Sequence, residues 1–146
     1  MDNNEDNNKN ISQFPDLGSE ITRDIIKAAI EVHRHLGPGL LESVYEACLV
    51  YELERAGLQV EHQKKLPVFY KGIEVGDGFR IDVWVNRKVV VELKATEKIL
   101  PIHEAQLLTY MKLSDTPLGL ILNFNETLLK NGIKRMALSK DAKTVE

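Results

Sequence analysis

The stretch FRIDVWVNRKVVVELK, from Phe79 to Lys94, decides the fold of this chain. Its two halves, 79–85 and 89–93, are rich in β-branched and aromatic residues, which favour β-strands. The polar residues at 86–88 separate the halves, as is typical of a hairpin turn. We therefore predict an antiparallel pair of strands.

Charged residues follow the alternation of these two strands. Because successive side chains of a strand point to opposite faces, Glu92 and Lys94 share one face of the second strand. In the first strand, the apolar residues predicted on the side opposite to Asp82 are Ile81, Val83 and Val85. A two-residue loop would leave Asp82 and Glu92 on opposite faces of the sheet. We therefore predict an odd-length turn at 86–88, or a bulge, that brings both carboxylates to one face.

Two carboxylates and one amine in this arrangement indicate a cation-dependent hydrolytic site. A hard divalent cation prefers oxygen ligands, which Asp82, Glu92 and the backbone carbonyl of Leu93 would supply. Lys94 would hold or deprotonate an attacking water and neutralise charge on a phosphate. The alternative is a solvated polar face on a surface hairpin. The valine run 89–91 argues against it, because such a run is typical of an interior strand, where unpaired charge is costly.

The rest of the chain predicts helices and further strands around this hairpin. Helices are expected at 19–36, with Ser19 as N-cap, at 41–56 and at 101–113. Extended segments are expected at 60–70, 73–75, 118–124 and 133–138, the last as an edge strand. The expected order is α-α-β-β-β-β-α-β-β, an α/β (α+β) fold with a mixed β-sheet flanked by helices.

Length and composition fit a single globular domain. The 146 residues are 43% apolar and 28% charged. We predict the domain at 19–140, after a disordered, acidic and Asn-rich arm at 1–18 and before a C-terminal tail at 141–146. The single cysteine, Cys48, excludes an internal disulfide, a four-cysteine zinc site and an iron–sulfur cluster held by this chain alone.

Charge and hydropathy narrow the partners that we expect. The net charge of −3 arises in the first 20 residues, which hold five acidic side chains and one lysine, so the remainder carries +1. The acidity of the chain therefore says little against a nucleic-acid partner. No apolar run reaches the roughly 20 residues that span a bilayer, so we expect a cytoplasmic protein with no membrane partner.

Predicted helices carry further candidate residues. Glu42 lies in a first helical turn, where the helix dipole alone favours a carboxylate by roughly 0.3–1 kcal/mol. Gln106 and Tyr110 lie four residues apart on one helix face. These two side chains could bond a phosphate or orient a metal ligand, although an ordinary pair on a helix surface has the same spacing.

Together these residues resemble a known nuclease superfamily. The string GLLESVY, from Gly39 to Tyr45, fits the G-x-x-E-x-x-Y signature of a family of small proteins within the PD-(D/E)xK nucleases. Asp82 and the run from Glu92 to Lys94 resemble the Asp and the (D/E)-x-K of that superfamily. The segment 106–110 resembles the Q-x-x-x-Y element of lambda-exonuclease-type and RecB-type nucleases. The similarity covers residues 20–138, and its α-β-β-β-α-β core has the order that we expect over 41–124.

The resemblance implies a restriction-endonuclease-like fold and a site with assigned roles. Asp82, Glu92 and the Leu93 carbonyl would bind the metal, with Glu42 as a further or water-mediated ligand. Lys94 would position the attacking water. In the substrate-orienting group, Gln106 and Tyr110 would orient the site and contact the phosphate backbone, and Tyr45 would either pack or contact the substrate.

The activity implied by the resemblance is that of a magnesium-dependent nuclease that cleaves DNA. Mn²⁺ is the alternative ion and RNA the alternative nucleic acid. The other functional hypothesis is a catalytically silent nucleic-acid-binding or protein-interaction module on the same fold. A homodimer and a subunit of a larger complex are left open for either hypothesis.

Overall fold

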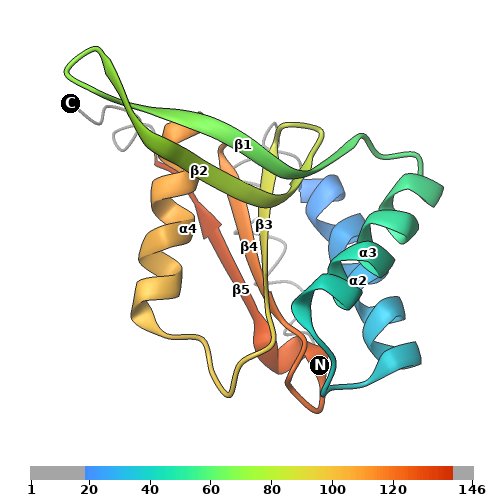
Figure 1. The fold of residues 1–146 in the computed structure, drawn as a ribbon. Helices are drawn as coiled ribbons and strands as arrows, with labels where there is room; N and C mark the ends of the chain where they lie inside the picture. The colour runs from blue at the N-terminus through green and yellow to red at the C-terminus, as the bar shows by residue number, and fades with distance from the viewer. Residues whose placement is uncertain (1–18, 140–146) are drawn as a thin grey trace.

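A five-stranded sheet lies between two helical layers (Figure 1). The structure, a computed structural model, describes residues 19–139, so the predicted arm at 1–18 and tail at 141–146 lie outside the described residues. The elements in chain order are α2 (Ser19–Leu36), α3 (Glu42–Arg55), β1 (Val60–Tyr70), β2 (Ile73–Val85), β3 (Val89–Lys94), α4 (Pro101–Leu113), β4 (Leu118–Asn123), the 3-10 helix η1 (Leu129–Gly132) and β5 (Ile133–Ala137). No helix within the described range is long and apolar enough to cross a bilayer.

The sheet is mixed, as predicted. Its strand order is β1-β2-β3-β4-β5, and all neighbours are antiparallel except β3 and β4, which are parallel. Parallel neighbours need a long crossover connection, which α4 provides. From α3 to β4 the order is α-β-β-β-α-β, which confirms the predicted core order, and β5 forms the predicted edge strand.

Each face of the sheet has its own hydrophobic cluster. Helices α2 and α3 cover one face, where their apolar side chains pack on Val83, Val91 and Leu93. Helix α4 covers the other face and packs on Trp84 and Val90. The valine run of β3 is buried on both sides, which confirms that β3 is an interior strand.

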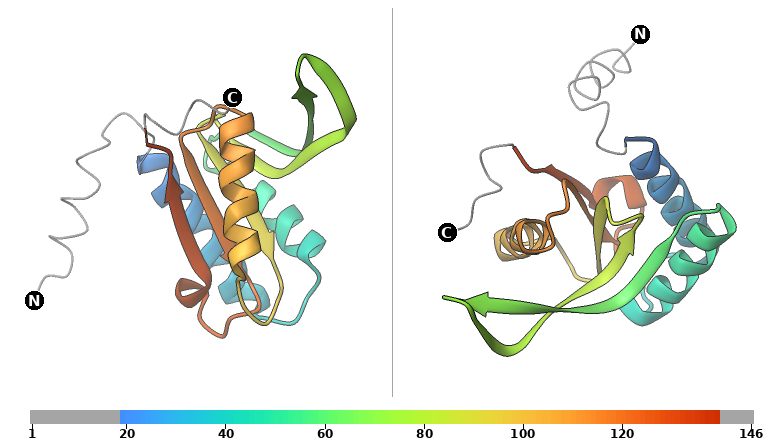
Figure 2. Two further views of the ribbon diagram at one scale, coloured as in Figure 1. Left: turned by 90° about the vertical axis from the view of Figure 1, so that its left-hand side faces the viewer. Right: turned by 90° about the horizontal axis from the view of Figure 1, so that it is seen from above.

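Strand β2 is longer than predicted. The expected strands at 73–75 and 79–85 form one continuous strand, so the sheet has five strands rather than six. Gly76 and Gly78 adopt φ of 62° and 77°, which bends the strand without ending it. A Cβ at Gly78 would lie 2.1 Å from the carbonyl oxygen of Leu66 in β1, so the two strands approach closely here. Figure 2 shows β1 and β2 extending past the rest of the sheet as a curved two-stranded ribbon.

Candidate active site

The turn between β2 and β3 places Asp82 and Glu92 at the same level of the sheet. The strands pair Val83 with Val91 and Val85 with Val89, across a three-residue turn at 86–88. One step further in this register, Asp82 lies opposite Glu92. The predicted odd-length turn is therefore confirmed.

The backbone ladder between β2 and β3 ends just before this carboxyl pair. The N–H of Leu93 donates to Oδ2 of Asp82 at 3.0 Å, so a side chain accepts the bond here. In β1, the position opposite Asp82 is Gln63, whose φ of 50° interrupts the pairing on that side as well. Asp82 therefore lies in an opening of the sheet, where its carboxyl group replaces backbone partners.

Strand β2 also changes face at Asp82. Ile81 packs in the cluster beneath α4, whereas Val83 and Val85 pack in the cluster beneath α2 and α3. The prediction that all three apolar residues share one side is therefore wrong. Strict alternation assumes a regular strand, and β2 twists at the point where its pairing is interrupted on both sides.

Glu92 is the buried member of the carboxyl pair. It is 5% exposed, and its Oε1 has no hydrogen-bond partner among residues 19–139. Burial raises the pKa of Glu92 to about 9, helped by the charge of Asp82 and a hydrogen bond with its carboxyl group, while Lys94 lowers it. Glu92 therefore holds a proton at neutral pH that a bound cation would displace. An unpartnered buried oxygen beside a second carboxylate fits a hard divalent cation.

Lys94 ends β3 on the same face as Glu92. Leu93 between them packs in the cluster beneath α2 and α3, so Glu92 and Lys94 project toward the α4 side. The chain beyond Lys94 is held by Asn123, a fully buried residue whose amide group bonds Thr96 N at 3.2 Å and Thr96 O at 2.9 Å. The sequence pattern did not single out Asn123, and its one signal is a polar residue at the end of an apolar run.

The comparisons with known proteins agree with this geometry. A family model for the PD-(D/E)XK nuclease superfamily matches residues 19–136. The chain belongs to the PD-(D/E)XK nuclease superfamily. Nucleases of this superfamily generally use divalent metal ions, in line with the carboxyl pair. Searches of curated proteins and of solved structures found no match.

Helix α3 of this PD-(D/E)XK chain brings Glu46 toward the carboxyl pair. Glu46 is half-buried and accepts a hydrogen bond from Gln63 Nε2 at 2.6 Å. Burial raises the pKa of Glu46, and the negative charges of Asp82 and Glu42 add to the rise, against the lowering effect of Gln63. The pKa of Glu46 thus responds to the charge of Asp82, although the sequence pattern did not single out Glu46.

Within residues 19–139, no hydrogen bond joins Glu42 to the carboxyl pair. Glu42 is the exposed first residue of α3, one helical turn before Glu46. Within residues 19–139, no three His, Cys, Asp or Glu side chains converge on one metal position. The role of Glu42 as a further or water-mediated ligand therefore stays a prediction.

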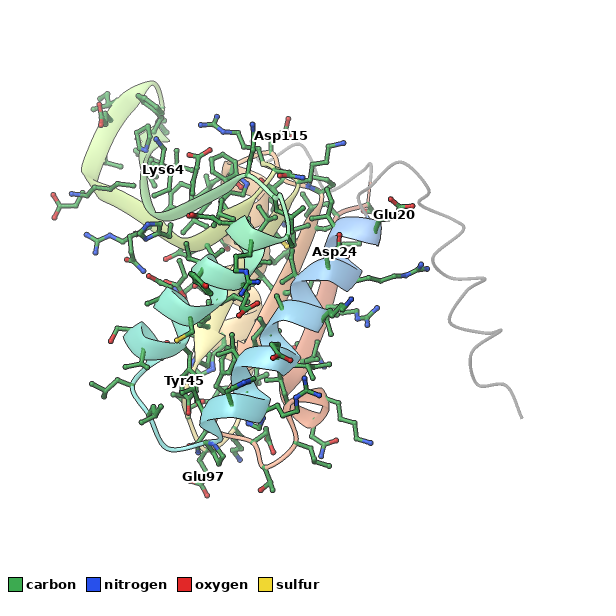
Figure 3. The ribbon with its side chains drawn as sticks, turned by 90° about the vertical axis from the view of Figure 1, so that its right-hand side faces the viewer. Glu20, Asp24, Tyr45, Lys64, Glu97 and Asp115 are labelled. Carbon is green, nitrogen blue, oxygen red and sulfur yellow. The ribbon has the colours of Figure 1, made fainter. Side chains whose placement is uncertain are left out.

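Tyr45 belongs to the hydrophobic core of this nuclease-superfamily domain. It is fully buried, and its ring stacks on Phe124 with 4.5 Å between centroids (the labelled Tyr45 in Figure 3 marks its position in α3). Its hydroxyl donates to Gly37 O at 2.6 Å and accepts from Leu40 N at 3.1 Å. These bonds fasten the loop before α3, where Gly39 has a φ of 104°. Of the two predicted roles for Tyr45, packing describes it and substrate contact does not.

Gln106 and Tyr110 lie together on α4. Gln106 Nε2 donates to the Tyr110 hydroxyl at 2.9 Å, and the Tyr110 ring lies 4.9 Å from that of Phe79 in β2. Since α4 covers the face from which Glu92 and Lys94 project, all four residues lie on one side of the sheet. Among the described residues, no hydrogen bond joins Gln106 or Tyr110 to the carboxyl pair.

Proposed function

We propose that this chain is a magnesium-dependent nuclease that hydrolyses phosphodiester bonds of DNA, with Asp82, Glu92 and Lys94 as catalytic residues. The convergence of Asp82 and Glu92 in the opening between β2 and β3 supports this proposal most strongly. Glu92 Oε1 is buried there with no hydrogen-bond partner in the described part of the chain, as expected of a group that binds a cation. Membership of the PD-(D/E)XK superfamily supports the nuclease class.

The residues around the opening would divide the chemistry among them. Asp82, Glu92 and the carbonyl of Leu93 would hold the cation, which acts as a Lewis acid and lowers the pKa of water. Glu92 would release its proton when the site is loaded. Lys94, on the same face as Glu92, would position the attacking water and offset charge on the phosphate. Glu46 would orient a water ligand, with Glu42 behind it.

Helix α4 supplies a phosphate-contacting pair in this proposal. Gln106 is exposed and already oriented by its bond to Tyr110, which leaves its amide oxygen and second N–H open to substrate. With this pair we assign the Q-x-x-x-Y element to Gln106 and Tyr110. We also place the chain in the G-x-x-E-x-x-Y family on the basis of Gly39, Glu42 and the packed Tyr45.

A cleavage assay with matched variants tests the proposal. Linear, circular and single-stranded DNA, and RNA, are incubated with wild-type protein in Mg²⁺, Mn²⁺ or EDTA. Asp82→Asn and Lys94→Gln should lower the cleavage rate by at least about 100-fold, whereas Lys98→Gln in the exposed loop after β3 should not change it. We expect no cleavage in EDTA.

The other outcomes also assign the function. Equal cleavage by wild type and Lys94→Gln would overturn the proposed site. Binding of DNA without cleavage in either cation would identify a catalytically silent nucleic-acid-binding module. Cleavage of RNA alone would replace the proposed substrate.

A further inference from the structure

Two cationic side chains oppose each other across the β1–β2 ribbon. Lys65 of β1 is the register partner of Arg80 of β2, and both residues are exposed. Like charges directly opposite each other on antiparallel strands destabilise the pair of strands. The repulsion between Lys65 and Arg80 therefore lowers the stability of the ribbon locally. The fold does not require cations at these two exposed positions. The labelled Lys64 in Figure 3 marks this part of the ribbon.

The packing beside this cationic pair prevents the strands from shifting register. The next residues, Leu66 and Phe79, are also register partners and pack in the cluster beneath α4. At Gly78 the two strands approach so closely that a Cβ would lie 2.1 Å from Leu66 O. A one-residue slip would expose Phe79 and create that clash. Lys65 and Arg80 are thus held opposite each other.

Neighbouring acidic side chains form no ion pair with either cation among residues 19–139. Glu61 is the acidic residue closest in β1, but it pairs with Arg87 at 2.8 Å and lies 3.9 Å from Lys64. Glu74 and Asp77 line a shallow hollow together with Lys65. Within residues 19–139, however, no acidic side chain forms an ion pair with Lys65 or Arg80.

The cationic pair lies close to Asp82 along the same ribbon. Arg80 is two residues before Asp82, a distance of about 7 Å along a strand. Lys65 is likewise two residues beyond Gln63, which bonds to Glu46. Because Phe79 and Ile81 face the α4 cluster, Arg80 projects from the other side of β2, as does the neighbouring position of Lys65.

We infer that Lys65 and Arg80 together bind a backbone phosphate of a nucleic acid beside the opening at Asp82, on the side of β2 away from α4. This inference rests on the proposed function. An arginine fork bonds two phosphate oxygens and a lysine adds a point charge, so the two side chains suit one phosphate. A phosphate between them also removes the repulsion across the strands. The ribbon in Figure 2 thus becomes the arm that holds the substrate strand beside the site.

Binding and stability, measured on the same variants, test this inference. Fluorescence anisotropy of labelled DNA and RNA oligonucleotides in EDTA, over a range of NaCl concentrations, gives Kd without cleavage. The double variant Lys65→Ala/Arg80→Ala should raise Kd by about tenfold and reduce the slope of log K against log salt by about 1. The control Lys130→Ala, an exposed residue of η1 at the far end of the sheet, should change neither.

The stability of the variants separates this role from a structural one. Removing either cation relieves repulsion, so the urea midpoint of Lys65→Ala and Arg80→Ala should stay or rise while Kd increases. Arg80→Glu places opposite charges across the strands, so it should raise the midpoint and still weaken binding. An unchanged Kd in the double variant, or a wild type that binds no oligonucleotide, would overturn the inference. Weakened binding by the variants combined with no cleavage in Mg²⁺ would instead leave the phosphate site standing and refute the proposed activity.

Discussion

Replacing Glu92 by glutamine tests whether the two carboxyl groups form one cation site. In the folded chain the pKa of Glu92 is raised from 4.5 to about 9, first by burial and then by Asp82. Between these values the folded chain keeps a proton on Glu92 that the unfolded chain has lost. Stability from this proton is fully present below pH 4.5 and is lost as the pH rises toward 9.

The size of this effect follows from the pH interval between the two pKa values of Glu92, in the unfolded and in the folded chain. Each pH unit within it lowers the free energy of unfolding by about 1.4 kcal/mol, so the loss from pH 5 to pH 7 is about 3 kcal/mol. That is a large share of the roughly 5–15 kcal/mol that stabilises a typical domain. Glu92→Gln has nearly the same shape and does not titrate, so its free energy of unfolding should lack this fall.

Urea unfolding in EDTA, followed by circular dichroism from pH 5 to pH 9, measures the difference. The free energy of wild type minus that of Glu92→Gln should decrease by about 3 kcal/mol between pH 5 and pH 7. The exposed Glu97→Gln should follow wild type at every pH. Because a cation replaces the proton, saturating Mn²⁺ should flatten the wild-type profile. Calorimetry at pH 7 in two buffers should then show about one proton released for each ion bound. A difference independent of pH, or Mn²⁺ binding without proton release, would refute the reasoning.

Three further sets of substitutions probe the surroundings of the site. Glu46→Gln should weaken Mn²⁺ binding by about tenfold in calorimetry, and Glu42→Gln should weaken it by much less. The reason is that the pKa of Glu46 is raised by the charge of Asp82. Equal effects of the two variants on Mn²⁺ affinity would contradict this ranking. Tyr45→Phe should lower the free energy of unfolding by about 1–3 kcal/mol, since Gly37 O and Leu40 N lose their buried partner, and should leave Mn²⁺ affinity unchanged. Gly78→Ala should lower the urea midpoint more than Gly76→Ala: both glycines have positive φ, but only the first has a carbonyl oxygen 2.1 Å from the new Cβ. Similar midpoints for the two glycine variants would mean that the strands move apart freely.

Local sequence signals were enough to predict most of the elements and the three-residue turn between β2 and β3. Helix α4 begins at Pro101, which suits a first helical position, and β3 is the buried valine run that was predicted. The hypothesis that Asp82 and Glu92 share a face predicted the odd-length turn that the structure shows, because a register depends on counting residues between strands. Each of these inferences uses contacts between residues that are near in sequence.

What the sequence could not supply depends on packing between distant segments. The fusion of 73–75 with 79–85 follows from the approach of Gly78 to Leu66, and the change of face at Asp82 follows from interrupted pairing on both sides. The approach of Glu46 to Asp82 depends on where α3 crosses the sheet. Helical spacing puts Glu42 and Glu46 on one face, one turn apart, and does not say how far each lies from the opening.

The irregular features of the domain gather along a short length of β1, β2 and β3. Lys65 and Arg80 place two positive charges opposite each other. Only two residues further along β2, Asp82 and Glu92 place two carboxyl groups opposite each other. Natural sequences break local rules mainly where function requires it, and each of these breaks is relieved by a ligand of opposite charge. A cation relieves the carboxyl pair and a phosphate relieves the cationic pair. A nucleic-acid strand with its metal ion carries both charges, so one substrate can relieve both costs.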